Sequence, residues 1–315
     1  MPSVDPLLFS PQSIAPETAA LNADIVAKLA ALPDIWSFPA ETIREARRAG
    51  KGAFPVSPKS PRAQTITIAG KGGPIGLRVI APADPKGVYL HLHGGGWMLG
   101  QADFQDNKLE QMVQATQLAC VSVDYRLAPE HPWPAGPDDC ETAALWLVAE
   151  GAKRFGTDRF FIGGESAGGN LSVVTLLRLR DRHGLTPFRG ANLIAGCYDL
   201  GLTPSARHFG SERLILTTRD VRLFVKRYLS RGEDPSTPDI SPLFADLSGM
   251  PPALFSIGTR DALLDDSLFM AARWEAAGAS ANLKIWPGGC HVFQAFDFPM
   301  AEAAFAAERD FIEAL

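Results

Sequence analysis

Residues 159–170 read Arg-Phe-Phe-Ile-Gly-Gly-Glu-Ser-Ala-Gly-Gly-Asn, and the chain continues as Leu-Ser-Val-Val-Thr-Leu-Leu. The stretch begins apolar and β-prone, passes through small residues and then becomes helical in pattern, which predicts a strand, a tight turn and a helix. The spacing Gly164-x-Ser166-x-Gly168 puts a serine at the tip of the turn, where its hydroxyl would project at the end of a sheet. A small-residue turn in any α/β protein has the same local pattern, so residues elsewhere must decide.

Strand and helix patterns alternate over the rest of the chain. Further strands are predicted at 64–69, 74–81, 88–92, 120–124, 191–197, 252–258 and 281–286. Helices are predicted at 16–32, 41–48, 103–119, 138–151, 218–230, 265–278 and 300–315. The first two strands are joined by a Gly-rich turn and predict a hairpin. The alternation predicts an α/β fold, with a mainly parallel sheet covered by helices on both faces.

Composition limits the classes of partner. The chain has 315 residues, of which 46% are hydrophobic, and a formal net charge of −5 without basic runs, so neither nucleic acid nor an anionic membrane is expected as a partner. No apolar stretch reaches 18 residues and the N-terminus has no signal-peptide pattern, which favours a soluble, cytoplasmic protein. The four cysteines, Cys120, Cys140, Cys197 and Cys290, lack metal-ligand spacing. Cys120 and Cys197 lie in apolar runs and Cys140 begins a helical stretch, so buried thiols are expected.

A serine nucleophile needs a base, and three histidines follow Ser166. His291 comes after the last predicted strand, at the sheet edge where the turn with the serine also ends, and it is the preferred base. His183 ends the helix after Ser166 and fits a C-terminal cap, whereas His208 lies in an irregular segment. Both stay open as less favoured alternatives.

The acid that orients the base is expected after the preceding strand. Asp261 ends that strand and is the preferred residue, because its carboxylate could then reach His291. Asp265 and Asp266 begin the next helix and are alternatives, although negative charge at a helix N-terminus is common for its own sake. A thiol nucleophile at Cys290 is a further alternative, but this residue has no such turn of its own.

Donors for an oxyanion are expected in His93-Gly94-Gly95-Gly96, which follows the third predicted strand. Glycines allow the backbone to turn two N–H groups inward, and the N–H of Ala167 would be the third donor. We expect the His93 side chain to brace the loop and not to act in catalysis. Four aromatic residues are candidate walls of the substrate pocket: Trp97, Tyr198, Phe209 and Phe38. For Trp36, core packing is at least as good an explanation.

Over residues 60–315, these motifs together resemble the hormone-sensitive-lipase-like bacterial esterases of the α/β-hydrolase superfamily. Its most specific pieces are His93–Trp97, Asp124–Ala135, Gly164–Asn170 and Gly249–Leu254. The resemblance implies Ser166 as nucleophile, Asp261 as acid and His291 as base, with oxyanion donors on Gly95, Gly96 and Ala167. It also implies an eight-stranded α/β-hydrolase sheet with a helical cap, no metal or cofactor, a short- to medium-chain ester substrate, and often a homodimer.

The resemblance divides the chain into four parts. Residues 1–50 and 201–240 would form the cap, while 51–200 and 241–315 would form the catalytic core. Two positions depart from the family. Glu165 stands where Asp or Thr is usual, and Ala262 replaces the proline that normally follows the acid. Three other functions stay open: an amidase, lactonase or carbamate hydrolase, a non-catalytic binder, and a true lipase.

Overall fold

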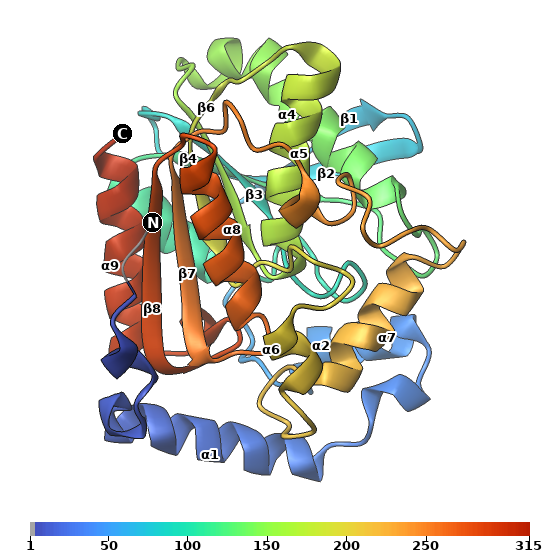
Figure 1. Cartoon of the computed structure of the whole chain (residues 1–315). Helices are drawn as coiled ribbons and strands as arrows, with labels where there is room; N and C mark the ends of the chain where they lie inside the picture. The colour runs from blue at the N-terminus through green and yellow to red at the C-terminus, as the bar shows by residue number, and fades with distance from the viewer. Residues whose placement is uncertain (1–3) are drawn as a thin grey trace.

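The computed structural model describes residues 4–315, which contain one eight-stranded sheet (Figure 1). The strand order is β1-β2-β4-β3-β5-β6-β7-β8. Strand β2 pairs antiparallel with β1 and β4, and the other neighbours pair in parallel, which confirms the predicted mainly parallel sheet and its opening hairpin. The bounds are β1 (Gln64–Gly70), β2 (Gly73–Ile80), β3 (Val88–Leu92), β4 (Ala119–Asp124), β5 (Phe160–Glu165), β6 (Phe188–Ile194), β7 (Ala253–Arg260) and β8 (Ala281–Cys290).

Helices cover both faces of the sheet. The two helices on one face are α3 (Asp106–Thr116) and α9 (Pro299–Glu313), and the three on the other are α4 (Ala135–Phe155), α5 (Ala167–His183) and α8 (Leu264–Ala276). Successive side chains of a strand point to opposite faces, so Tyr89 of β3 packs with α3 and α9, whereas Leu90 packs with α4 and α5. Within residues 4–315, no helix has the length and apolarity that crossing a bilayer would require.

Two further segments lie outside these layers, one before β1 and one between β6 and β7. The first contains η1 (Pro6–Phe9), η2 (Pro11–Ser13), α1 (Pro16–Ala31), η3 (Ile35–Ser37) and α2 (Ala40–Arg48). The second contains α6 (Pro204–His208), α7 (Thr218–Tyr228) and η4 (Pro242–Phe244). Leu29 of α1 clusters with Phe293, just after β8, and Ile43 of α2 clusters with Met98, just after β3. The first segment therefore covers the edge where the parallel strands end (Figure 1).

Local backbone geometry shortens some predicted elements. The helix predicted over 103–119 is α3 (Asp106–Thr116), because Gln117 adopts a left-handed conformation with φ 58° and ends it, so that Ala119 joins β4. The strand predicted over 191–197 ends at Ile194, and Ala195 has φ 45°. The short helix α6 was not predicted, since five residues are too few for a helical period to appear.

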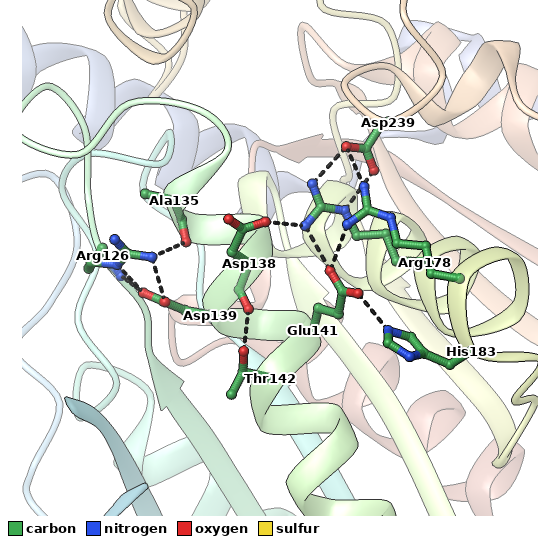
Figure 2. A network of polar contacts seen from close by, with 10 residues as sticks. Arg126, Ala135, Asp138, Asp139, Glu141, Thr142, Arg178, His183 and Asp239 are labelled. Carbon is green, nitrogen blue, oxygen red and sulfur yellow. Dashed lines mark hydrogen bonds and ion pairs between the residues drawn. The ribbon is translucent and has the colours of Figure 1, made fainter. Parts of the chain in front are cut away.

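A buried ion network joins α4, α5 and the chain returning to the sheet (Figure 2). The Arg178 side chain of α5 is only 2% exposed and donates to both carboxylate oxygens of Asp239 at 2.6 Å. It also donates to Asp138 and Glu141 of α4 at 2.9 and 3.1 Å. His183 Nε2 lies 2.7 Å from Glu141 Oε1. The segment around Asp239 is therefore held against α5 by a network of charges.

Candidate active site

Ser166 is the hinge between β5 and α5. Its backbone has φ 57° and ψ −118°, a strained conformation for a residue with a side chain, and its N–H donates to the Ile194 carbonyl at 2.8 Å. A Cβ at Gly164 or Gly168 would lie 2.0 or 1.8 Å from the Leu92 carbonyl oxygen of the neighbouring strand. Glycine at both positions therefore lets the turn pass close to β3 and present the Ser166 hydroxyl at the sheet edge.

Three predicted residues meet at this edge. His291, immediately after β8, has its Nε2 2.9 Å from Ser166 Oγ, and its Nδ1 lies 3.0 and 2.9 Å from the two Asp261 carboxylate oxygens. A carboxylate only accepts, so Nδ1 carries the proton and donates, which leaves Nε2 to accept from the serine hydroxyl. Asp261 follows β7, its side chain is fully buried, and it also accepts from the Leu263 N–H at 2.9 Å. The arrangement is suited to moving a proton away from Ser166.

The alternative bases and acids lie elsewhere. His183 is paired with Glu141, and His208 is exposed on α6. Asp266 is fully buried and accepts from the backbone N–H groups of Tyr198 and Asp199 at 2.6 and 2.9 Å, and burial raises its pKa to about 7 despite these hydrogen bonds.

Asp265 and Cys290, the remaining alternatives, are also unsuited to the roles considered for them. Asp265 accepts from the Ser205 N–H at 2.8 Å. Burial raises the pKa of the Cys290 thiol to about 12, so it is a poor nucleophile. Among the described residues, the histidine, cysteine and acidic side chains form no group of three or more that could hold a metal ion.

The glycine loop after β3 turns back toward Ser166. Gly95 has φ 110° and Gly96 has φ 61°, conformations that side chains rarely adopt, and a Cβ on Gly96 would lie 2.3 Å from Phe224 Cδ1. No hydrogen bond within the described part of the chain uses the N–H groups of Gly95, Gly96 or Ala167. Three backbone donors are therefore free in residues that line the same cavity as Ser166. The Gly94 N–H differs, because it donates to Glu165.

His93 braces this loop, as expected. Its ring stacks on Tyr125 with centroids 4.1 Å apart, and its Nδ1 donates to the Gly94 carbonyl at 2.9 Å. The Tyr125 hydroxyl donates to the His93 carbonyl at 2.6 Å. Burial lowers the pKa of His93 to about 4, so its ring is uncharged at neutral pH.

Glu165 is a site residue whose place the sequence does not reveal. Its Oε1 accepts from the Gly94 N–H at 2.6 Å and from Gln105 Nε2 at 3.1 Å, and its Oε2 lies 3.0 Å from His91 Nε2. Burial acts to raise the pKa of Glu165, but the attraction and hydrogen bond of His91 and the Gly94 N–H outweigh it, and the net shift is downward. The carboxylate thus joins the turn at Ser166 to the glycine loop. The sequence shows an acidic residue between Gly164 and Ser166, but it does not show that this residue contacts the glycine loop.

The cavity above Ser166 has a volume of about 1130 Å³. Ser166, His291 and the glycine loop form its floor. Its walls are formed by α2, α7 and residues 51–59, which follow α2. Of the four predicted pocket residues, Trp97 and Phe38 line it. Trp97 is stacked on Tyr228 with ring centroids 4.6 Å apart and is only 4% exposed, so only a small part of its ring can contact a molecule in the cavity.

The prediction for the other two aromatic residues was wrong. Tyr198 does not line the cavity because it is fully buried and packs edge-on against Phe255. Phe209 is also outside the lining and packs against the core. Phe224 of α7 lines the cavity instead. Trp36 packs edge-on against Phe224, with ring centroids 4.8 Å apart. Phe224 follows Val221 by three residues on one helical face, a spacing that could have identified it.

Known proteins resemble this chain over most of its length. Residues 89–295 match the family described as alpha/beta hydrolase fold. An esterase of Acinetobacter venetianus is 32% identical over 265 residues, which cover 83% of this chain and 85% of that protein. The carboxylesterase NlhH of Mycobacterium tuberculosis is 37% identical over 232 residues, covering 70% of this chain and 71% of that protein.

Solved structures agree with the sequence relatives. A hyperthermophilic esterase from Pyrobaculum calidifontis superposes with a TM-score of 0.84 at 31% identity, covering 96% of this chain and 98% of that one. An esterase from the bacterial hormone-sensitive lipase family gives a TM-score of 0.81 at 30% identity, covering 95% and 98%. The chain therefore belongs to the α/β-hydrolase family, among the bacterial esterases of the hormone-sensitive lipase group, and it is a carboxylesterase.

Proposed function

We propose that this carboxylesterase works through a covalent acyl-enzyme on Ser166, with His291 as general base and Asp261 as the acid that orients it. The continuous line of hydrogen bonds from Ser166 Oγ through the imidazole to Asp261 is the observation that supports this most directly. Ser166 Oγ attacks the ester carbonyl carbon while its proton passes to His291 Nε2. The intermediate collapses when the imidazolium protonates the leaving alcohol. Water, deprotonated by His291, then releases the acid.

The N–H groups of Gly95, Gly96 and Ala167 would stabilise the oxyanion of each tetrahedral intermediate. Their support is that these residues line the same cavity as Ser166 and that their N–H groups have no acceptor within the described residues. Donors that are held in place before the reaction need no reorganisation when charge develops, and each contributes roughly 3 to 4 kcal/mol to such reactions. The N-terminus of α5 adds a favourable field at the same point.

The preferred substrates would be esters of short- to medium-chain acids. The cavity supports this, because its volume of about 1130 Å³ accommodates a small ester and its walls are largely apolar. Residues 1–50 and 201–240 would act as a cap, with 51–200 and 241–315 as the core, since α2 and α7 form walls of the cavity over the sheet edge. The homodimer and the cytoplasmic location stay predictions from the sequence.

Replacement of the serine tests the mechanism. We expect Ser166→Ala to lower kcat for p-nitrophenyl butyrate by on the order of 10⁴-fold or more, because without the hydroxyl no acyl-enzyme forms. Ser211→Ala, in the wall of the same cavity but exposed, is the matched control and should behave as wild type. A fluorophosphonate probe should label wild type at Ser166 alone. Near-normal turnover by Ser166→Ala would overturn the proposal, and a series of longer p-nitrophenyl esters would test the chain-length preference.

A further inference from the structure

The cavity wall formed by α2 carries an arginine that has no acceptor. Arg47 lines the cavity that contains Ser166, and its guanidinium lies 5.9 Å from the Phe54 ring centroid and 5.6 Å from that of Phe104. Within residues 4–315 it makes no ion pair and donates no hydrogen bond. Burial lowers the pKa of Arg47 to about 10, opposed by the charge of Glu165, so the side chain is still a cation at neutral pH.

The other arginines around the cavity have acceptors, and the lysines differ in exposure and pairing. Arg48 pairs with Glu41, Lys59 pairs with Asp103, and Arg219 pairs with Asp34. Arg213 donates to the Leu32 carbonyl. Lys51 and Lys108 make no ion pair within the described residues. Lys51 is exposed, so water solvates it, whereas the half-buried Lys108 is near enough to Glu308 to act on the pKa of that acid. Among the arginines that line the cavity within residues 4–315, Arg47 is the one without an acceptor.

Glu165 does not supply the missing partner. Its two oxygens already accept from Gly94, Gln105 and His91, and no hydrogen bond or ion pair joins it to Arg47. Two aromatic rings near 6 Å compensate only part of the lost hydration of a guanidinium. Five N–H donors in a planar fork remain available to a group inside the cavity.

We propose that Arg47 binds a carboxylate carried by the substrate, so that this enzyme prefers esters that bear a second, anionic group. The proposal rests on the function proposed above, because the ester must lie on Ser166 while the carboxylate reaches Arg47. A planar carboxylate matches the guanidinium fork in a bidentate pair. The exposed Lys51 at the same cavity adds positive potential that attracts such a substrate.

The test compares charged and neutral esters of equal length. One series is the monomethyl esters of succinate, glutarate and adipate, each matched with the neutral ester in which an amide replaces the free carboxylate. A second series puts the carboxylate on the alcohol, as in acetyl esters of short hydroxy acids and their amides. We expect wild type to favour the charged member of at least one pair by about tenfold or more in kcat/KM. The series that shows the preference identifies which side of the ester carries the carboxylate.

Variants at α2 connect that preference to Arg47. Arg47→Met should lower kcat/KM for the favoured charged ester by about ten- to hundredfold, mainly through KM, and leave p-nitrophenyl butyrate within about twofold. Arg47→Lys should recover part of the loss. Arg48→Met, on the same helix and paired with Glu41 at the surface, is the control and should keep the preference.

Two outcomes would overturn the proposal. One is a wild-type enzyme that favours no charged ester in either series. The other is an Arg47→Met variant that loses charged and neutral substrates equally, which would assign Arg47 to packing between Phe54 and Phe104. In both cases a wild type that still turns over neutral esters through Ser166 leaves the mechanism proposed above intact, so the two proposals fail separately.

Discussion

At the scale of the residue, Glu165 connects the serine turn to the glycine loop. It stands where the family usually has Asp or Thr, and its carboxylate is long enough to reach the Gly94 N–H at 2.6 Å while facing His91. Gly94 is next to Gly95, whose N–H is a proposed oxyanion donor. We infer that Glu165 is a positioning residue, which acts on the reaction through the loop and does not touch the substrate.

Glu165→Gln tests this inference. We expect kcat to fall about ten- to hundredfold with KM little changed, because a displaced oxyanion donor affects the transition state more than substrate binding. Glu165→Asp keeps the charge and should recover part of the activity. Steady-state kinetics on p-nitrophenyl butyrate, with circular dichroism to check folding, gives the comparison. Wild-type kcat in Glu165→Gln would show that the loop needs no such brace.

The same carboxylate contributes to stability in a pH-dependent way. The folded-state pKa of Glu165 lies below its ordinary value of 4.5. A lowered pKa means that the folded protein binds the proton less well than the unfolded chain. Its stabilising contribution is therefore present in full above about pH 4.5 and is lost as the pH falls through the lowered value.

At the scale of the element, burial decides which ion pairs matter. Arg178 and Arg182 both lie on α5, and both contact Glu141 and Asp239. Their side chains differ in exposure, 2% for Arg178 and 44% for Arg182. Exposed ion pairs are screened by water, whereas removing one member of a buried network leaves the other charges unpaired.

Replacing each arginine by methionine separates the two cases. We expect Arg178→Met to lower the free energy of unfolding by roughly 3 to 5 kcal/mol, because Asp138, Glu141 and Asp239 would keep like charges at close range. Arg182→Met should cost less than about 1 kcal/mol. Urea denaturation measures both. Equal losses in the two variants would mean that the network contributes no more than surface pairs do.

At the scale of the whole molecule, α9 packs on one face of the sheet and buries an acidic residue, Glu308, against it. Glu308 accepts a hydrogen bond from Asn192 Nδ2 of β6 at 3.1 Å and is 6% exposed. Burial raises its pKa from 4.5 to about 7, although the hydrogen bond from Asn192 acts in the opposite direction. The folded protein therefore holds this proton in a pH range where the unfolded chain has lost it, and stability falls as the pH rises from about 4.5 to about 7.

Glu308→Gln should remove this dependence. Relative to wild type, the variant should gain up to roughly 3 kcal/mol between pH 4.5 and 7, and the difference should stay constant above that range. Denaturant titrations at several pH values measure it. Glu302→Gln, on the exposed side of α9, is the control. If the curves of Glu308→Gln and wild type run parallel, Glu308 is ionised in the folded state.

Local patterns and strand topology were enough to predict the sheet and the meeting of Ser166, Asp261 and His291 at its edge. Strands and helices are predictable because apolar periodicity and glycine positions act over a few residues, and the serine between Gly164 and Gly168 gains its meaning only together with the glycine loop, Asp261 and His291. The hydrogen-bonded placement of Asp261 and His291 followed from topology, since parallel strands end at one edge. Gln117 was missed because a left-handed residue without glycine leaves no mark in the sequence.

The walls of the cavity, by contrast, depend on how distant segments pack together. Tyr198 was predicted to line it and is instead buried, whereas Arg47 and Phe224 lie in its walls. Arg47 and Ser166 are more than a hundred residues apart, and whether a charge finds a partner depends on which distant segments pack around it. No local pattern contains that information, because desolvation and pairing arise only when the chain has folded.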